Sequence, residues 1–232
     1  MNGDQLGARF EQIRAQIEKA ALKCGRSTRE ITLIAISKTH PASIVRQAIE
    51  LGATDIGENR VQEAEQKINE VGRTAARWHL VGHLQANKAR RAVQLFDVIH
   101  SLDSLELARR LDRLCDEEGR ENLSVVIQVD LGHEETKSGV NEDELPSLID
   151  GLTDLQRIEV VGLMTLPPFF DDPERARPFF RRLRELRDEC GARGAFRDRK
   201  GDLSMGMTND FAVAIEEGAT MVRIGTAIFG NR

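Results

Sequence analysis

The chain has 232 residues, 40% hydrophobic and 31% charged, a composition typical of a soluble globular protein that forms one domain over residues 1–232. Its 33 basic and 38 acidic residues give a net charge of −5, which argues against a surface that binds nucleic acid. There is no apolar run of about 18 residues and no targeting peptide, so the sequence predicts a cytoplasmic protein without membrane association.

An amphipathic helix is predicted at the start of the chain. Apolar side chains recur there at spacings of three and four, at Leu6, Phe10, Ile13, Ile17 and Ala21. Beyond it, short apolar runs alternate with helical patterns. The runs cover residues 31–37, 54–57, 78–82, 97–101, 124–130, 159–164, 202–206 and 221–225. The helical patterns include 42–53, 104–119 and 176–191, the last of which is expected to end on Gly191 as a C-cap.

Strands rich in β-branched residues, each followed by a helix, are typical of a parallel sheet covered on both faces. The eight runs predict a single (β/α)8 TIM barrel with an extra N-terminal helix. An open doubly wound sheet is the alternative, but the turn SKTHPAS (37–43) lacks the glycine-rich fingerprint of that fold. The segment LPPFFDDPE (166–174) is predicted to be a long loop.

In such barrels, functional residues lie where strands end and the following loops begin. The polar residues at the predicted ends are Ser37 and Lys38, Glu58 and Asn59, His83, His100 and Ser101, Asp130, Thr165, Ser204, and Arg223, Gly225 and Thr226. Burial of Lys38 in an apolar barrel mouth would lower its pKa and leave a neutral amine able to form an imine with a carbonyl compound. A lysine that merely reaches solvent is the alternative for Lys38 taken alone.

A phosphate site is predicted where the eighth run leads into a short helix, at Arg223 to Thr226. Barrels often bind phosphate around the loops after the seventh and eighth strands. Gly225 would let the backbone approach an anion closely, and Thr226 and Ser204 could donate hydroxyl groups. An ordinary tight turn is the alternative for Gly225.

The segments SKTHP, GENRVQEA, WHLVGHLQANK, KSG, GLM, LSMGMTND and TMVRIGTAIFG, in this order, resemble the pyridoxal phosphate homeostasis proteins. They span residues 37–230, so the resemblance covers nearly the whole chain. It implies a barrel like the N-terminal barrel of alanine racemases and bacterial-type ornithine decarboxylases, with pyridoxal 5′-phosphate (PLP) as the cofactor.

The resemblance also implies roles for single residues. Lys38 matches the lysine that forms a Schiff base with PLP. Ser204, Gly225 and Thr226 match the phosphate cradle. The remaining matches are Arg223 with the arginine that faces the pyridine nitrogen, Asn59 with the asparagine beside the ring, and Met205 with a residue that lines the pocket.

Arg223 argues against transamination and leaves racemisation or plain carriage of the cofactor open, whereas the absence of tyrosine argues against the racemase. A guanidinium cannot accept a proton, and its charge disfavours a protonated pyridine nitrogen, which makes the ring a poorer electron sink. Racemases of this type take a tyrosine from an additional domain, and the related decarboxylases take a cysteine. This chain has no tyrosine and ends six residues after Thr226, and Cys24, Cys115 and Cys190 fall in helical patterns that favour buried apolar roles.

We therefore predict a protein without catalytic residues that holds PLP on Lys38 for intracellular vitamin B6 homeostasis. It is expected to be a monomer, with PLP-dependent apo-enzymes as candidate recipients of the cofactor. The alternative is an amino-acid racemase or decarboxylase reduced to its barrel. A third hypothesis, an aldolase-like barrel that uses Lys38 on a sugar phosphate, leaves Arg223 unexplained.

No metal site is predicted. In an extended segment His79 and His83 would lie about 13 Å apart, too far to share one ion. The basic stretch 181–187 is interspersed with acidic residues and fits the solvent face of an outer helix. Asp130 and the pair Glu134 and Glu135 are expected to lie in a solvated loop.

Overall fold

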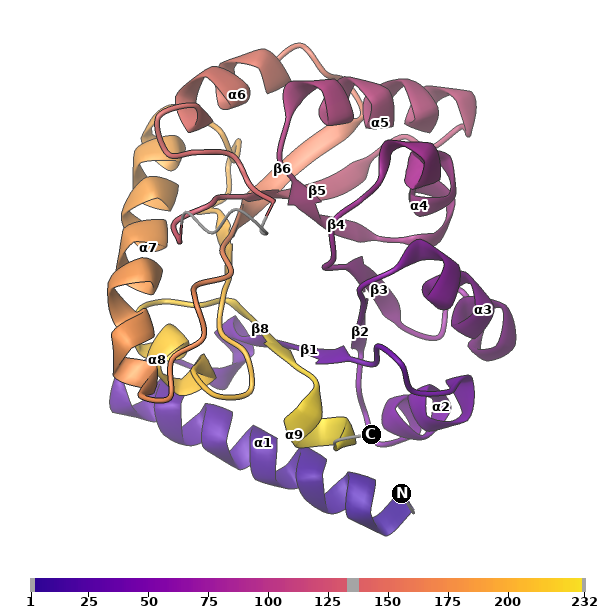
Figure 1. The fold of residues 1–232 in the computed structure, drawn as a ribbon, viewed down its shortest axis with the longest axis vertical. Coiled ribbons are helices and arrows are strands. Elements are labelled where there is room, and N and C mark those ends of the chain that lie inside the picture. Colours follow the sequence, from indigo (N-terminus) through magenta and orange to yellow (C-terminus); the bar gives the residue numbers. More distant parts are fainter. Residues whose placement is uncertain (1–2, 133–137, 231–232) are drawn as a thin grey trace.

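The computed structural model describes residues 3–132 and 138–230. Its eight strands pair in parallel, each with its neighbour in the chain, and the last pairs with the first to close a barrel ringed by helices (Figure 1). The strands are β1 (Thr32–Ile36), β2 (Asp55–Glu58), β3 (Arg77–Leu80), β4 (Val98–Leu102), β5 (Leu123–Gln128), β6 (Ile158–Met164), β7 (Asp202–Ser204) and β8 (Met221–Ile224). The predicted (β/α)8 barrel is confirmed, and each predicted strand is present with its ends shifted by at most two residues.

The helices cover the outside of the barrel. They are α1 (Gly3–Lys23), α2 (Ala42–Glu50), α3 (Val61–Val71), α4 (Ala89–Leu95), α5 (Leu105–Glu117), α6 (Leu145–Leu152), α7 (Arg177–Ala192), α8 (Phe211–Glu216) and α9 (Thr226–Phe229). Short 3₁₀ helices lie at Thr28–Glu30, Ala86–Lys88 and Pro173–Ala176. Within the described ranges, none of these helices is both long and apolar enough to cross a membrane.

The predicted N-terminal helix is confirmed as α1. All five residues of its predicted apolar stripe are buried, and the helix lies against α8 and α9 across one side of the ring (Figure 1). Because β8 and β1 meet on this side, α1 covers the seam that closes the barrel.

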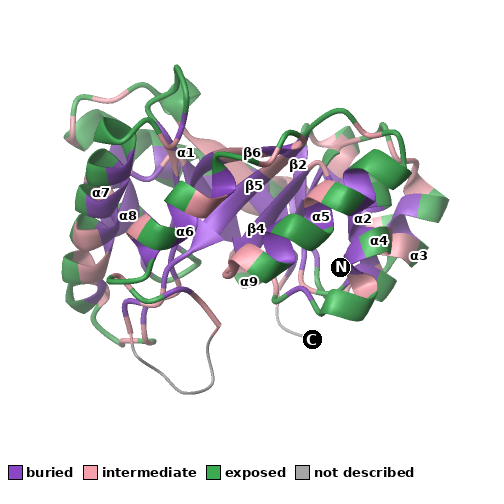
Figure 2. Ribbon diagram, turned by 90° about the horizontal axis from the view of Figure 1, so that it is seen from above, coloured by how far each residue is buried: buried purple, intermediate pink, exposed green. Residues whose placement is uncertain are grey.

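The main hydrophobic core lies between the strands and the helices, so the strands and the inner helix faces are buried while the outer faces are exposed (Figure 2). Two smaller apolar clusters belong to alternate strand positions, one at Ile34, Ile36 and Met221 and the other at Val98, Val126, Val161 and Met164. A Cβ added to Gly57 would lie 2.4 Å from Cδ1 of Ile36, so a larger side chain there would require Ile36 to shift.

The predicted C-cap at Gly191 is wrong. The helix continues to Ala192, and the first left-handed residue after it is Gly194, with φ 79°. Glycine is favoured where φ is positive, so Gly194 allows the chain to leave the helix. Cys115 and Cys190 are buried in α5 and α7 as expected, whereas Cys24 is half-buried one residue beyond α1.

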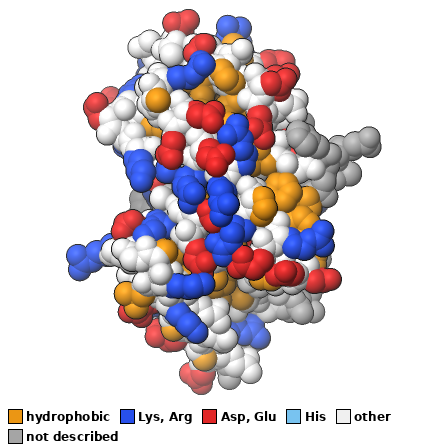
Figure 3. Space-filling model, turned by 90° about the vertical axis from the view of Figure 1, so that its left-hand side faces the viewer, with side chains coloured by type: hydrophobic (Ala, Val, Ile, Leu, Met, Phe, Trp, Pro, Cys, Tyr) orange, Lys and Arg blue, Asp and Glu red, His pale blue; other side chains and the backbone are white. Residues whose placement is uncertain are grey.

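The basic face of α7 is paired with acidic groups, and Lys/Arg and Asp/Glu side chains intermix over this side of the molecule (Figure 3). Arg181 and Arg184 pair with Glu217, and Arg182 pairs with Glu142. Arg187 departs from the predicted solvent face: it is buried and donates to the carbonyl oxygen of Gly201 at 3.1 Å.

Glu217 is a candidate for acid-sensitive stability. Its side chain is 7% exposed and lies 3.0–3.2 Å from Arg177, Arg181 and Arg184. Burial raises the pKa of Glu217, but the hydrogen bonds from Arg181 and Arg177 outweigh it and hold the pKa below the ordinary value. The stabilisation is therefore present above the unfolded-state pKa of about 4.3 and is lost as pH falls through the lower folded-state pKa.

We expect Glu217→Gln to lower the free energy of unfolding at neutral pH by about 1.5–3 kcal/mol, because charged hydrogen bonds are lost. The decline of stability in acid should also become shallower. Urea unfolding measured across acidic and neutral pH tests both effects, with the exposed Glu189→Gln as the control. The prediction would be contradicted if Glu217→Gln had the same free energy of unfolding as the wild type at neutral pH.

Candidate functional site

A pocket of about 390 Å³ lies at the carboxyl ends of the strands. Five of the seven predicted site residues line it: Lys38, Asn59, Arg223, Gly225 and Thr226. The rest of the lining is mostly apolar, namely Ile36, Val81, Leu166, Pro167, Pro168, Phe169 and Met207, together with the polar Thr208, Asn209 and Asp210. Residues far apart in the sequence meet here because parallel strands deliver their ends to the same rim.

Lys38 lies two residues beyond β1 and lines this pocket. Its side chain is exposed, so the expected burial in an apolar barrel mouth is wrong. The reason is local: Ser37 ends the buried run, and the chain turns outward at Thr39, whose φ of 70° lies in the left-handed region. Such a conformation is strained for a β-branched residue and persists only where the surroundings hold it.

A charged cluster of Ser37, Glu58, Glu63 and Lys67 holds the backbone on both sides of Lys38. Lys67 donates to the carbonyl oxygen of Ser37 at 2.7 Å and pairs with Glu58 at 2.6 Å and Glu63 at 2.9 Å. The hydroxyl of Ser37 donates to Glu58, and the N–H of Thr39 donates to Glu63. The cluster therefore fixes the turn that presents Lys38.

The carboxyl groups of this cluster differ in environment. Burial raises the pKa of Glu58, although Lys67 opposes the shift. Burial also acts to raise the pKa of Glu63, but the hydrogen bonds from Lys67 and Thr39 bring it below the ordinary value. Sequence reasoning missed this cluster: the spacing of Glu63 and Lys67 indicates a helical pair, but not its burial.

Arg223 points a buried guanidinium toward the pocket from β8. Its Nη1 donates to the hydroxyl oxygen of Ser204 at 2.7 Å, and its Nη2 donates to the carbonyl oxygen of Thr165 at 2.9 Å. Burial lowers the pKa of Arg223 to about 10, opposed by the charge of Asp210. Arg223 is therefore still a cation at neutral pH.

Ser204 and Met205 are not among the pocket-lining residues. The Ser204 hydroxyl faces Arg223 and His100 inside the barrel. Because side chains alternate along β7, Met205 faces the opposite way and packs in the core under the helices. The methionine that lines the pocket is Met207, which follows the turn at Gly206 (φ 92°).

The predicted phosphate segment reaches the pocket at Gly225 and Thr226, where α9 begins. The first N–H groups of a helix lack acceptors within it, so those of Thr226 and Ala227 are available donors beside a glycine. A Cβ on Gly225 would lie 3.3 Å from the carbonyl oxygen of Ile36, closer than most side chains tolerate. Gly225 thus permits the close packing of this turn against β1.

Two further features of the pocket were not anticipated. The predicted loop after β6 supplies its apolar side, with Phe169 77% exposed at the rim. Asp210, which accepts a hydrogen bond from the N–H of Met207 at 2.6 Å, is the one acidic residue lining the pocket in the described part of the chain. Burial raises the pKa of Asp210 above its ordinary value. Its place within LSMGMTND was the only sequence signal.

The two histidines considered as a metal pair lie in different surroundings. His79 is fully buried against Asp55 and His100, whereas His83 is exposed near Ser138 and Asp103. Over residues 3–132 and 138–230, no group of three or more His, Cys, Asp or Glu side chains could hold a metal ion. Asp130 is half-buried and donates its N–H to Val140, while Glu134 and Glu135 lie outside the described residues.

The donor set fits a phosphorylated aromatic aldehyde. The pocket combines a primary amine, a buried cation, backbone donors beside a glycine and an apolar wall that can cover a ring. Its volume of about 390 Å³ falls within the range of small-ligand sites, roughly 300–1,000 Å³. The positions of Lys38 and Arg223 on the same pocket are the observation on which this fit depends.

Comparison with known proteins agrees with this chemistry. The profile of the family described as "Alanine racemase, N-terminal domain" matches residues 8–232. The chain is 41% identical over 226 residues to a pyridoxal phosphate homeostasis protein of Aquifex aeolicus, covering 97% of each. It is 42% identical over 229 residues to another from Escherichia coli K12, covering 95% of this chain and 94% of that one.

The chain is also similar in fold and sequence to a protein of solved structure. PipY of Synechococcus elongatus PCC7942, in a structure described as having PLP bound, has a TM-score of 0.85 at 36% identity. The match covers 97% of this chain and 100% of that one.

The charged cluster yields a stability prediction. Lys67→Met leaves Glu58 buried without its counter-charge, so we expect the free energy of unfolding to fall by about 3–5 kcal/mol. Urea unfolding measures the loss, and the exposed Lys19→Met serves as a control with a change below about 0.5 kcal/mol.

A second variant separates the ion pair from simple packing. Glu58→Gln combined with Lys67→Met should recover part of the loss, since it removes the unpaired charge. The losses in the free energy of unfolding caused by Glu58→Gln alone and by Lys67→Met alone are compared with that of the double variant. If the two single losses simply add in the double variant, the two charges are not coupled.

Proposed function

The chain belongs to the family of pyridoxal phosphate homeostasis proteins, and from this we propose that it binds PLP in the pocket at the carboxyl ends of its strands, as a Schiff base on Lys38. The observation that carries the proposal is that Lys38 and Arg223 line the same pocket. When bound, PLP supplies an aldehyde that captures amines. Lys38 would provide the amine: its Nζ forms the C=N bond, and the aldehyde oxygen leaves as water.

The remaining residues would hold and orient the cofactor. The backbone at Gly225 and Thr226 offers donors for the phosphate, and Asn59 lies on the β2 side of the pocket. Ser204 would act through Arg223, because its hydroxyl accepts from that guanidinium. Met207 takes the lining place that the sequence assigned to Met205.

We propose that the protein holds PLP without turning over a substrate. Arg223 stays charged and has no proton to gain, so it disfavours a protonated ring nitrogen and the carbanion chemistry that such a nitrogen supports. The chain also contains no tyrosine to serve as a second acid/base. A role in vitamin B6 homeostasis follows from this chemistry, with PLP-dependent apo-enzymes as candidate recipients; a monomeric state and a cytoplasmic location stay predictions.

The attachment at Lys38 can be tested directly. After incubation with PLP, borohydride reduction should add one phosphopyridoxyl group to Lys38 in the wild type and none in Lys38→Ala, as read by peptide mass spectrometry. Lys38→Ala should lose the visible absorption of the bound cofactor while the phosphate contacts retain some binding.

Lys88→Ala is the matched control, because Lys88 lines the neighbouring groove at the same end of the barrel. It should leave the labelling of Lys38 unchanged. Labelling that persists undiminished in Lys38→Ala would refute the assignment.

A barrel-only racemase is the second candidate, and Asp210 is the observation that favours it, as a carboxyl of raised pKa in the pocket. We expect no exchange of the α-proton of any of the twenty amino acids in deuterium oxide above that of free PLP. Mass spectrometry or NMR reads the exchange. If exchange exceeds this background and disappears in Asp210→Asn, the carrier hypothesis is rejected in favour of the racemase.

A further inference from the structure

A chain of hydrogen bonds crosses the interior of the barrel, from β2 to β8. Asp55 Oδ1 lies 2.9 Å from His79 Nε2, and His79 Nδ1 lies 2.9 Å from His100 Nε2. His100 Nδ1 lies 3.0 Å from the Ser204 hydroxyl oxygen, which accepts from Arg223 Nη1 at 2.7 Å. We call these five residues the interior chain; each comes from a different strand, and all five are buried.

The two ends fix the bonds in which they take part, and with both imidazoles neutral they also fix the bonds in between. A guanidinium can only donate, and a carboxylate can only accept. Burial acts to raise the pKa of Asp55, but the hydrogen bonds from His79 and Thr54 bring it below the ordinary value, so Asp55 is a carboxylate at neutral pH. The Ser204 hydroxyl then donates to His100 Nδ1, His100 Nε2–H donates to His79 Nδ1, and His79 Nε2–H donates to Asp55.

This pattern requires both imidazoles to be neutral. Burial lowers the pKa of His79, although Asp55 opposes the shift. Burial places the pKa of His100 well below its ordinary value, and the charges of Arg223 and Arg77 act in the same direction. The charged residues Arg77 and Asp97 also act on His79, with opposite signs. A protonated His100 would need to donate from Nδ1 to Ser204 and would lie close to the Arg223 cation.

The interior chain accounts for the burial of Arg223. Removing a cation from water is costly unless it is paired and hydrogen-bonded. Among the residues that the structure describes, none forms a direct ion pair with Arg223, and Asp210 is already bonded to the N–H of Met207. Asp210 is the carboxylate whose charge acts on Arg223. The interior chain links the same guanidinium, by hydrogen bonds through Ser204, His100 and His79, to a second buried carboxylate, Asp55.

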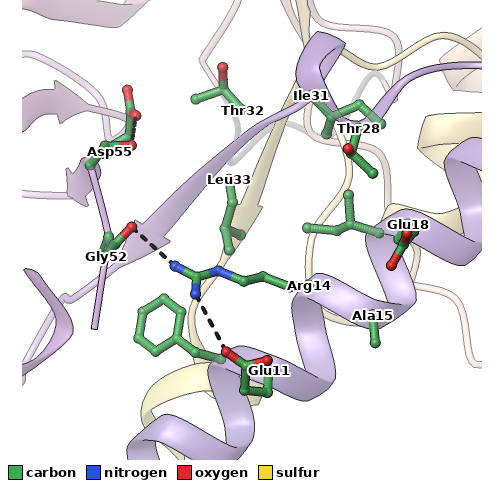
Figure 4. Close-up of a pocket in the computed structure, with 14 residues that line it drawn as sticks. Glu11, Arg14, Ala15, Glu18, Thr28, Ile31, Thr32, Leu33, Gly52 and Asp55 are labelled. Atoms are coloured by element: carbon green, nitrogen blue, oxygen red, sulfur yellow. Dashed lines mark hydrogen bonds and ion pairs between the residues drawn. The ribbon is translucent and has the colours of Figure 1, made fainter.

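The location of Asp55 separates this charge from the cofactor pocket. Asp55 begins β2 and lines a different pocket, of about 580 Å³, between α1 and the amino ends of β1 and β2. Figure 4 shows Asp55 at the strand side of that pocket, across from Arg14, which bonds to the backbone of Gly52. Asp55, the negative end of the interior chain, thus faces the amino end of the barrel. Arg223, its positive end, faces the carboxyl end.

We propose that Asp55, His79 and His100 are positioning residues that act through Ser204 to hold the guanidinium of Arg223 directed at the cofactor ring. This inference deepens the proposed function and rests on it, since the ring is what Arg223 would face. The three residues do not touch the pocket at the carboxyl ends of the strands.

The hydrogen-bond directions can be tested without any cofactor. Two-bond ¹H–¹⁵N correlation spectra of the labelled protein distinguish the tautomers of each histidine. At neutral pH, His79 and His100 should both be neutral with the proton on Nε2. A proton on Nδ1 of either residue, or a positively charged ring, would overturn the interior chain as described.

The effect on the cofactor is tested with Asp55→Asn, in which the side chain can still accept from His79 but carries no charge. We expect the visible band of bound PLP to shift and the affinity for PLP to fall about tenfold, the equivalent of about 1.4 kcal/mol. His100→Phe, which interrupts the interior chain, should change the band in the same direction. Borohydride should still label Lys38 in both variants.

Asp202→Asn is the matched control, since Asp202 begins β7 at the same end of the barrel but bonds to Thr220 outside the interior chain. Its spectrum and affinity should equal those of the wild type. An Asp55→Asn spectrum and affinity identical to the wild type would overturn the proposal. A wild type that binds no PLP would instead refute the proposed function, and the histidine spectra would still decide whether the interior chain exists.

Discussion

The polar contacts in the barrel interior depend on the buried cation of Arg223. A guanidinium taken out of water must find acceptors, and this one finds the carbonyl oxygen of Thr165 and the hydroxyl of Ser204. The Ser204 hydroxyl is also bonded to His100, His100 to His79, and His79 to Asp55. A barrel interior that could have been filled by aliphatic side chains is therefore polar along one path and apolar on either side of it.

The two nitrogen-bearing side chains of the pocket are supported independently. Arg223 depends on contacts inside the barrel, from β3, β4 and β7. Lys38 depends on the charged cluster outside the barrel, between the strands and α3. A substitution in one support leaves the other in place, so the roles proposed for Lys38 in attachment and for Arg223 at the ring can be tested separately by mutation.

The sequence predicted the fold well, because eight β-branched runs and a helical stripe such as that of α1 have clear periodicities. It also predicted five of the residues that line the pocket, since strand ends of a parallel barrel meet at one rim. The errors of the sequence analysis concern the direction in which single side chains point at the ends of strands. Met205 and Met207 would share a face of an extended strand, and it is the turn at Gly206 that sends them in different directions. The exposure of Lys38 likewise depends on the positive φ of Thr39.

The supporting groups were beyond sequence reasoning for a different reason. His79, Asp55 and Lys67 acquire their roles from partners 9 to 30 residues away, which no local pattern reports. Burial of Lys67 in particular runs against the usual preference of lysine for the surface. Only the closed sheet, which places β2 beside β3 and α3 against β2, makes these contacts visible.

The exposure of Lys38 bears on how quickly a bound aldehyde could leave. An imine is broken when water or another amine attacks its carbon, and this attack needs open space beside the lysine nitrogen. An attachment lysine sealed inside a barrel would make each release wait for a local opening of the fold. Lys38 is exposed on a turn held by Lys67, so within the described residues the proposed loading and unloading would need no local opening of the fold. For a cofactor held as proposed, the exchange rate would then depend on imine chemistry and on the concentration of competing amines.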